Sequence, residues 1–330
     1  MRSLITGVAG FAGGYLSAHI AEVAPDDEIW GLVLPSEPGV LPDHVQVVYG
    51  NLTEPQSLTG TLDKVRPDLI FHLAGATSVA SSWERPDQAF RVNLVGTVNL
   101  FEALRQLDAR PRVVVASSAE VYGRVPLNKQ PITERQPLRP LSPYGSSKAA
   151  QDLVAAQYFD TRQLPCVRLR LFHHTGPRRP GHFVASSFAR QIARIEHGLE
   201  DPVVAVGNLE VVRDITDVRD IARAYWLAAT AARAGEAYNV CSGNGVFIRS
   251  LLEQLLEFSD HKIEIRQDLD RMRAVDIPHL VGDHSRFTAD TGWNPEIPLE
   301  TTLRDLLDWW RNQEVTSNQG SVIRPTLSPA

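Results

Sequence analysis

Short apolar segments alternate with segments of helical periodicity through the first half of the chain. The apolar segments cover residues 3–6, 28–34, 45–50, 69–75 and 112–118, and helix-like segments occupy 14–23 and 89–107. Strands that are separated by helices form βαβ units and pair in parallel. Helices then cover both faces of the sheet, which requires strands that are apolar nearly throughout, as these are. The pattern therefore predicts an α/β fold with a doubly wound parallel sheet.

The second half of the chain mixes helices and strands less regularly. A helix from Tyr144 to about Phe159 and a strand at 165–172 continue the first pattern, after which proline and glycine crowd residues 173–182. Further helices or strands are predicted at 183–198, 202–207, 218–232, 236–242, 248–259 and 299–313. We expect a large domain at 1–172 with parts of 210–245, a smaller mixed α/β lobe interleaved through 173–312, and a tail at 313–330.

Composition and charge exclude several classes of protein. Of the 330 residues, 43% are hydrophobic and 22% are charged, which is ordinary for a soluble globular protein. The formal net charge is −6, so no overall basic field exists to attract nucleic acid. The sequence shows neither a signal-peptide layout nor an apolar segment long enough to span a membrane. We expect a cytoplasmic protein without a membrane anchor or a metal, in which Cys166 and Cys241 are buried structural thiols.

Glycines spaced three residues apart follow the first predicted strand. The stretch "LITGVAGFAGGYL" places Gly7, Gly10 and Gly13 between that strand and a predicted helix. In a dinucleotide-binding fold the first glycine forms the tight turn, the second admits the backbone to the pyrophosphate, and the third allows close helix packing. Amides at the start of the helix then face the phosphate charge. The stretch predicts NAD or NADP binding, with an ordinary glycine-rich turn as the alternative.

The end of the second strand leaves the choice of cofactor open. An acid there would hold the ribose hydroxyls of NAD, and a nearby arginine would accept the 2′-phosphate of NADP. Leu34, Pro35 and Ser36 supply neither signal. Glu37, in the predicted loop that follows, could still reach the ribose, and a solvated loop carboxylate is the favoured alternative.

Tyr144 and Lys148 lie four residues apart in the stretch "SPYGSSKAA". This spacing puts both side chains on one helix face. A phenol, whose pKa is about 10, becomes a useful acid or base near neutral pH only beside a positive charge, which Lys148 would supply. Ser118 ends a predicted strand, where sites form in open α/β sheets, and would hold the substrate oxygen. A Tyr and a Lys exposed on an amphipathic helix are the alternative.

Together these segments resemble the extended short-chain dehydrogenase/reductase family across about residues 1 to 312. The resemblance rests on the glycine stretch, "HLAG" at 72–75, Asn93, Ser118 and the Tyr144–Lys148 pair. Within the family, stretches such as "VGNLEVVRDITDVRDIARAYW" and "TGWNPEIPLETTLRDLLDWW" are similar to the GDP-mannose branch. The resemblance implies a Rossmann domain, a smaller C-terminal substrate lobe, an NAD or NADP cofactor and a GDP-linked nucleotide-sugar substrate.

The resemblance also implies roles for residues of this sequence. The catalytic residues would be Ser118, Glu120, Tyr144 and Lys148. The cofactor would be bound by Gly7, Gly10, Phe11, Ala12, Gly13, Asn51, Leu52, Leu73, Ala74, Gly75, Asn93, Tyr144 and Lys148. The substrate would be bound by His173, Arg190, Arg213, Arg273 and Asp276. Arg213 and Arg273 would bind the diphosphate, and an ion pair of Arg213 with Asp214 or Asp217 is the alternative.

Three positions depart from the family's pattern. His173 replaces the asparagine of the usual R-x-F-N-x-x-G-P run, so the usual substrate amide is missing. Asn51 is uncharged where the family carries an acid, and it could pair with an adenine edge instead. Ala274 and Asp276 replace proline and glutamate near Arg273, which implies a different hold on the nucleotide.

Four functions remain open. A GDP-4-keto-6-deoxy-mannose 4-reductase would need Tyr144, Ser118 and Lys148, and the similarity of the second half favours it. A GDP-mannose 4,6-dehydratase would also use Glu120 as a base. Ala119 stands where dTDP-glucose dehydratases carry an Asp, but GDP-mannose dehydratases use a hydroxyl and the Glu instead. A nucleotide-sugar 4-epimerase ranks third. A nucleotide-sensing regulator, which binds without turnover, typically lacks the Tyr or the Lys that this chain keeps.

Two predicted helices, at 92–104 and 146–159, carry apolar and small faces that build a dimer contact in relatives. The resemblance therefore implies a homodimer, and burial of both faces within one chain is the alternative.

Overall fold

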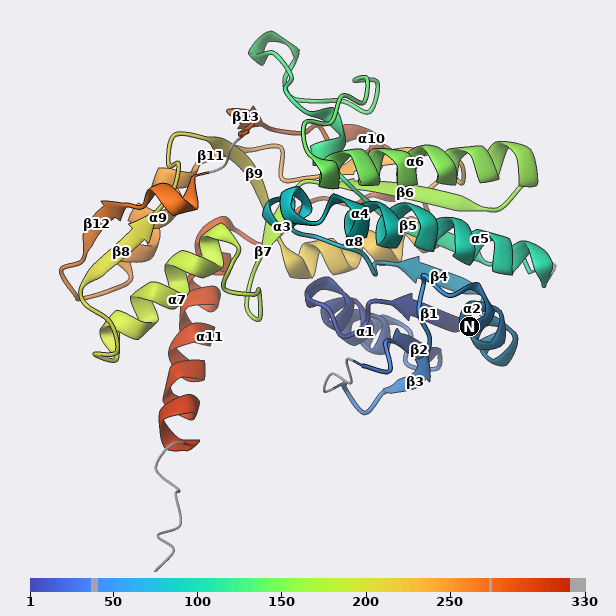
Figure 1. The fold of residues 1–330 in the computed structure, drawn as a ribbon, viewed down its shortest axis with the longest axis horizontal. Helices are drawn as coiled ribbons and strands as arrows, with labels where there is room; N and C mark the ends of the chain where they lie inside the picture. The colour runs from blue at the N-terminus through green and yellow to red at the C-terminus, as the bar shows by residue number, and fades with distance from the viewer. Residues whose placement is uncertain (37–40, 108, 273–274, 321–330) are drawn as a thin grey trace, which may run out of the picture. The chain divides into compact units, whose positions relative to one another are not determined.

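The computed structural model describes residues 1–36, 41–107, 109–272 and 275–320, with the side chains of 315–320 left out. The chain divides into two compact units (Figure 1). Unit 1 takes the described residues of 1–174, 212–245 and 275–296, and unit 2 takes those of 175–211, 246–274 and 297–330.

Unit 1 is built on a parallel sheet of seven strands in the order β10-β6-β5-β4-β1-β2-β3. In chain order the strands are β1 Arg2–Thr6, β2 Glu28–Val33, β3 Val45–Tyr49, β4 Leu69–His72, β5 Arg112–Ser118, β6 Cys166–Leu171 and β10 Ala237–Val240. The chain adds β2 and β3 on one side of β1 and then returns to its other side with β4, so a topological switch lies between β1 and β4. This confirms the predicted doubly wound Rossmann-type sheet, and such a switch is where open α/β sheets bind ligands.

Alternating side chains of each strand pack against helices on opposite faces of this sheet. On one face, Ile5 and Val114 join the apolar side of α1 (Phe11–Val23) and α8 (Val218–Thr230). On the other, Leu4 and Val113 join α2 (Pro55–Val65), α5 (Gly96–Gln106) and α6 (Pro143–Arg162). Both faces of the central strands are therefore buried, which is why their sequences are continuous apolar runs.

The remaining elements of unit 1 are short. They include α3 Val79–Glu84, α4 Pro86–Phe90, α10 Ser285–Thr291, and the parallel strand pair β9 Val212–Asp217 and β13 His279–Leu280. Two further short strands, β7 His173–Thr175 and β11 Gly245–Phe247, lie where the chain passes from one unit to the other. Cys166 and Cys241 are both buried, as predicted, and burial raises the pKa of the Cys166 thiol to about 12.

Unit 2 contains three α-helices and one strand pair among its described residues. The helices are α7 Val184–Glu196, α9 Ile248–Glu257 and α11 Leu299–Gly320, and the parallel strands are β8 Val203–Val206 and β12 Glu264–Gln267. Arg311 of α11 donates two hydrogen bonds of 2.7 Å to the Glu196 carboxylate of α7, which joins these helices. Helix α11 continues to Gly320, beyond the residue at which we expected the tail to begin.

None of the helices in the described part of the chain combines the length and the apolar character that crossing a bilayer requires.

Candidate active site

The glycine loop after β1 has the backbone that the sequence motif requires. Gly7 has a φ of 75°, a conformation that favours glycine, and its carbonyl accepts a 3.0 Å hydrogen bond from the N–H of Gly10. A Cβ at Gly13 would collide with the Gly7 carbonyl oxygen and approach the Val8 Cα to 2.7 Å. Gly10 caps α1 without a side-chain hydrogen bond. Phe11 and Ala12 open that helix, so the loop is shaped to admit a phosphate to backbone amides.

The end of β4 lies directly against this loop. A Cβ at Gly7 would lie 2.8 Å from the backbone nitrogen of Ala74. The N–H of Leu73 donates to the Thr6 carbonyl at 3.2 Å, and the N–H of Ala74 donates to the Thr6 hydroxyl at 3.1 Å. The two segments therefore meet at the switch point between β1 and β4.

Asn93 joins the end of β4 to α6. It is fully buried in a π-helical turn, Arg91–Val95, a geometry that often marks functional sites. Its side chain bonds both backbone groups of Ala76, at 2.8 and 3.2 Å, and donates to the Ser147 hydroxyl at 2.9 Å. A Cβ at Gly75 would lie 2.6 Å from the Asn93 side-chain oxygen and 3.5 Å from Lys148 Nζ, so Asn93 and Lys148 meet at Gly75.

Lys148 is buried and held at two points. Its Nζ donates to the Ala116 carbonyl of β5 at 2.7 Å and to Gln151 Oε1 at 2.9 Å. Burial lowers the pKa of Lys148 to about 8, because the apolar surroundings disfavour the charged form. The ammonium is still the main form at neutral pH.

Tyr144 precedes Lys148 by one helical turn near the start of α6. Its backbone N–H donates to the hydroxyl of Ser82, a buried residue of α3, at 3.1 Å, and that hydroxyl donates to the Val79 carbonyl at 2.7 Å. Tyr144 is partly exposed and lies near Tyr225 of α8, whose pKa is raised first by burial and then by Tyr144. The sequence analysis missed Ser82, because nothing along the chain links it to a helix that begins about sixty residues later.

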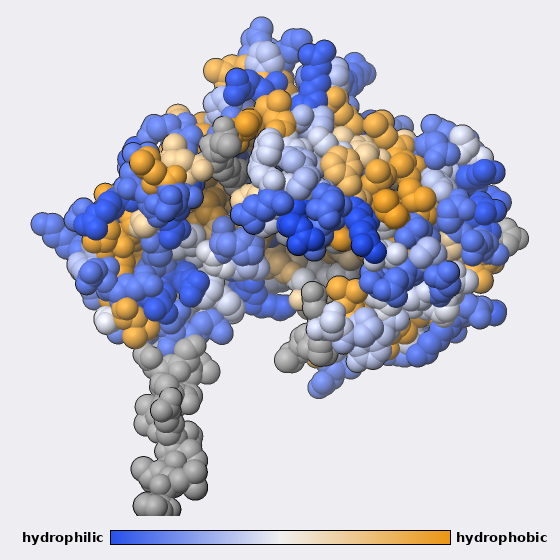
Figure 2. Space-filling view, in the orientation of Figure 1, coloured by the Kyte–Doolittle hydropathy of each residue, from blue (hydrophilic) through white to orange (hydrophobic). Residues whose placement is uncertain are grey.

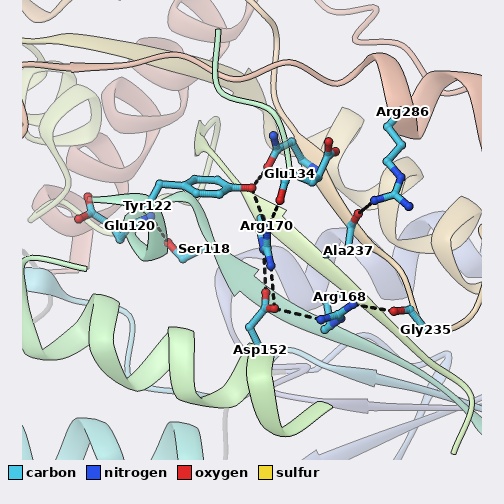
Figure 3. Close-up of polar contacts among 11 residues, drawn as sticks. Ser118, Glu120, Tyr122, Glu134, Asp152, Arg168, Arg170, Gly235, Ala237 and Arg286 are labelled. Carbon is cyan, nitrogen blue, oxygen red and sulfur yellow. Dashed lines mark hydrogen bonds and ion pairs between the residues drawn. The ribbon is translucent and has the colours of Figure 1, made fainter. Parts of the chain in front are cut away.

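Ser118 and Glu120 lie in the turn that follows β5. The Ser118 hydroxyl accepts a 3.2 Å hydrogen bond from the Glu120 N–H and caps a 3-10 turn, Ala119–Tyr122 (Figure 3). A Cβ on Gly145, the residue after Tyr144, would lie only 2.9 Å from the Glu120 carbonyl oxygen. The turn that carries Ser118 and Glu120 therefore packs on the first turn of the helix that carries Tyr144.

A buried ionic cluster fastens that turn to α6 (Figure 3). Arg170 of β6 donates to both Asp152 carboxylate oxygens at 3.0 Å and to the Tyr122 hydroxyl at 3.1 Å. The Tyr122 hydroxyl donates to Asn239 at 2.7 Å, and Arg168 adds a 3.3 Å bond to Asp152. Burial alone would raise the pKa of Asp152, but the hydrogen bonds and charge of Arg170 outweigh it and leave that pKa below its ordinary value.

The sequence analysis overlooked this cluster as well. The strand sequence "CVRLRL" places two arginines in a strand that is otherwise apolar. Arginine is almost never buried without a partner, so that pattern could have predicted a buried acid nearby.

Two residues that were predicted to bind the cofactor, Asn51 and Leu52, form hydrogen bonds with nearby protein groups. The Asn51 side chain accepts from the Thr53 N–H at 3.0 Å and donates to Glu54 at 2.9 Å, which closes the turn before α2. Leu52 is buried, and its carbonyl accepts a 2.9 Å hydrogen bond from Asn99 of α5.

The predicted substrate residues fall in different places. Arg213 is 4% exposed and pairs with Asp276 at 2.6 Å, a partner that the sequence analysis did not consider for it. His173 begins β7, and the ring of the next residue, His174, stacks on Phe11 at 6.0 Å between centroids. Arg190 lies exposed on α7 of unit 2, with its guanidinium 5.5 Å from the centre of the Trp310 ring, and Arg273 lies outside the described residues.

The chain matches a family model described as GDP-mannose 4,6 dehydratase over residues 4–306. It is 37% identical over 312 residues to the GDP-6-deoxy-D-mannose reductase of Pseudomonas aeruginosa, covering 94% of this chain and 98% of the relative. Among solved structures it is similar to RMD from Pseudomonas aeruginosa complexed with NADPH (TM-score 0.83, 34% identity, 94% of this chain and 99% of that one). It is also similar to the UDP-glucose 4-epimerase of Thermus thermophilus in complex with NAD (TM-score 0.84, 30% identity, 94% and 99%).

Proposed function

Because the chain belongs to the GDP-mannose 4,6-dehydratase family of extended short-chain dehydrogenases/reductases, we propose that it is an NAD(P)H-dependent reductase of GDP-4-keto-6-deoxy-mannose. The observation that carries this choice is the 37% identity to a GDP-6-deoxy-D-mannose reductase, which extends over nearly the whole of both chains. Ala119 argues only against a dehydratase of the dTDP-glucose kind, which carries an Asp there; it is compatible with a reductase and with a GDP-mannose dehydratase.

The residues of unit 1 fit a nicotinamide dinucleotide. Gly7 and Gly13 leave no room for side chains between β1 and α1, and a Cβ at Gly10 would lie 3.1 Å from the Gly7 carbonyl oxygen. The start of α1 would face the diphosphate. Gly75 and Lys148 would line the ribose and nicotinamide side of the site. When bound, the cofactor supplies the hydride that reduces C4 of the sugar.

The protein residues supply the proton and the orientation. Tyr144 would donate its hydroxyl proton to the keto oxygen as that oxygen gains negative charge, and the Ser118 hydroxyl would donate a hydrogen bond to the same oxygen. The Lys148 ammonium would stabilise the resulting tyrosinate. The packing of Gly145 on Glu120 supports this arrangement, because it holds the Ser118 turn against the first turn of α6.

A GDP-mannose 4,6-dehydratase is the second candidate. The family model carries that name, and Glu120 lies in the turn that packs beside Tyr144, where a base for the C5 proton would be needed. A nucleotide-sugar 4-epimerase ranks below both, and a regulator that only binds nucleotide ranks last because Tyr144 and Lys148 are both kept.

One pair of assays separates the reductase from the dehydratase. Purified protein is incubated with GDP-4-keto-6-deoxy-mannose plus NADPH or NADH, and separately with GDP-mannose alone. The proposal expects reduced nicotinamide to be consumed in the first assay, in proportion to the sugar reduced. A keto sugar formed from GDP-mannose without net cofactor change would replace the proposal by the dehydratase.

We also propose that the enzyme is a cytoplasmic homodimer that pairs through α5 and α6. Apolar side chains gather over these helices (Figure 2). Val95, the last residue of the π-helical turn before α5, is 45% exposed, and Leu153 of α6 is 60% exposed. If the dimer is stable, the two chains together should bury about 1,200 to 2,000 Å² of surface at this contact. Light scattering coupled to gel filtration should give twice the mass of the chain, and Leu153→Glu should reduce it to the mass of one chain.

A further inference from the structure

A continuous chain of buried hydrogen bonds runs from the glycine loop to Lys148. Thr6 Oγ1 lies 2.9 Å from His72 Nδ1, and His72 Nε2 lies 2.9 Å from Thr97 Oγ1. Gln151 Nε2 lies 2.8 Å from the same Thr97 oxygen, and Gln151 Oε1 lies 2.9 Å from Lys148 Nζ. Four polar residues connect the loop to Lys148, and each is completely buried. They are Thr6, His72, Thr97 and Gln151.

The direction of every hydrogen bond in this chain is determined by its neighbours. The Thr97 hydroxyl donates its one proton to the Asn93 carbonyl at 2.7 Å, so it must accept from both His72 and Gln151. His72 then carries its proton on Nε2, and Nδ1 accepts from Thr6. Burial, followed by the charge of Lys148, lowers the pKa of His72 to about 3, which is consistent with a neutral ring.

The same argument fixes the orientation of the Gln151 amide. Since its nitrogen has to donate to Thr97, its oxygen is the atom that faces Lys148 Nζ. A reversed amide would place an N–H against the ammonium and an oxygen against a hydroxyl without a proton to give. The network therefore presents one neutral acceptor to Lys148 in one fixed position.

Few other titratable groups face Lys148. The group that faces it from β4 is the neutral ring of His72, and the group that faces it from β5 is the uncharged carbonyl of Ala116. On α6 itself, Tyr144 precedes it by one turn, and Asp152 follows by one turn but is held by Arg170 and Arg168. No carboxylate is hydrogen-bonded to Lys148 among the described residues, so Gln151 is the side chain that sets how firmly the ammonium is held.

We propose that Gln151 is a positioning residue, which holds the Lys148 ammonium beside Tyr144 with a neutral acceptor and links it through Thr97, His72 and Thr6 to the cofactor loop. The catalytic part of this inference rests on the proposed function, because it assigns Lys148 its role there. A neutral partner stabilises the ammonium less than a carboxylate would. The Tyr144–Lys148 pair therefore loses its first proton at a lower pH than it would beside a carboxylate.

Two substitutions of Gln151 should shift the pKa of Lys148 in opposite directions. Gln151→Glu places one carboxylate oxygen near Nζ, where the amide oxygen now lies at 2.9 Å, and the Thr97 hydroxyl turns from the Asn93 carbonyl to donate to the other oxygen. Lys148 should then keep its proton to a pH higher by about one unit or more. Gln151→Leu removes the acceptor, so Lys148 should lose its proton at a lower pH. Gln106→Leu, at an exposed position in the last turn of α5, is the matched control and should change nothing.

The titration can be read without any turnover. The sequence contains four lysines, Lys64, Lys129, Lys148 and Lys262. In protein labelled with ¹³C at lysine Cε, the Lys148 signal is assigned with Lys148→Arg and followed by NMR against pH. We expect its midpoint to rise in Gln151→Glu, to fall in Gln151→Leu and to stay unchanged in Gln106→Leu.

The rate of keto-sugar reduction is then measured over the same pH range. The alkaline limb of kcat/KM reports the first proton lost from the coupled pair, so it should follow the NMR midpoints in the same order. kcat should fall by about ten- to a hundredfold in Gln151→Leu, with a smaller change in KM.

The outcomes separate the two proposals. If wild-type protein reduces no keto sugar, the proposed function fails, and the NMR titration still tests the position of Gln151. If the wild type is active but both Gln151 variants titrate like Gln106→Leu, the inference about Gln151 is wrong. If Gln151→Leu does not fold, the titration of Gln151→Glu alone tests the inference: an upward shift of the Lys148 midpoint supports it, and an unchanged midpoint overturns it.

Discussion

Replacing Asp152 by Asn tests the buried ionic cluster that ties α6 to the turn after β5. The Asp152 side chain is completely buried, and it receives bonds of 3.0, 3.0 and 3.3 Å from Arg170 and Arg168. The variant leaves the Arg170 guanidinium, whose side chain is 8% exposed, without its counter-charge. Breaking a buried pair in this way costs about 3 to 5 kcal/mol.

Thermal unfolding measures this cost. With about 2 to 4 °C lost per kcal/mol in domains of this general size, the midpoint should fall by about 6 to 20 °C. The control is Asp63→Asn, which removes an exposed ion pair with Arg66 on α2 and should change stability by under about 0.5 kcal/mol. If both variants unfold at the wild-type temperature, the cluster does not stabilise unit 1 and the reasoning is refuted.

The pH dependence of stability gives a second test of the same cluster. The pKa of Asp152 is lower in the folded protein than in the unfolded chain, where it is ordinary, near 3.9. Its contribution is therefore complete above about pH 4 and is lost as pH falls through the folded value. Urea unfolding between acid and neutral pH should show a shallower acid decline in Asp152→Asn than in the wild type, and parallel curves would contradict this.

Three further substitutions probe the site. Gly13→Ala forces a methyl group against the Gly7 carbonyl, so the Kd for NADPH, measured by fluorescence titration, should rise about tenfold or more, an effect of about 1.4 kcal/mol. Gly60→Ala, on α2 with nothing within 4 Å, is the control and should bind as the wild type does. Gly145→Ala pushes on the Glu120 carbonyl; a shift on the order of 1 Å should lower kcat by about a hundredfold, and an unchanged kcat would refute the packing argument. Ser82→Ala removes the acceptor of the Tyr144 N–H and should cost about 1 kcal/mol by thermal unfolding, whereas a loss of zero would show that water replaces the hydroxyl.

Local signals made the sheet and the loop predictable from the sequence. Strands such as Leu69–His72 are buried on both faces, so their apolar character appears directly in the chain. Gly7 and Gly13 are required by backbone geometry within a few residues, and the spacing of Tyr144 and Lys148 is a property of one helix.

The residues that hold the site residues in place could not be predicted in the same way. Their partners lie far away in the sequence, so no short stretch of the chain indicates the contact. Ser82 and Tyr144 are brought together by α3 and α6, and Gln151 reaches Thr97 across 54 positions of the chain. Asp276 lies 63 positions from Arg213, so the nearer acids Asp214 and Asp217 were the partners that local sequence suggested. Spacing predicts which residues share an element, and only the packed fold shows which elements meet.

The most direct test of the proposed function follows the hydride itself. NADPH carrying deuterium at the transferred position of C4 in the nicotinamide ring is incubated with the protein and GDP-4-keto-6-deoxy-mannose, and the product is examined by NMR. The account predicts deuterium at sugar C4 of a GDP-6-deoxy-sugar in wild-type protein and almost none with Tyr144→Phe. Product that forms without deuterium at C4, or turnover that survives unchanged in Tyr144→Phe, would contradict it.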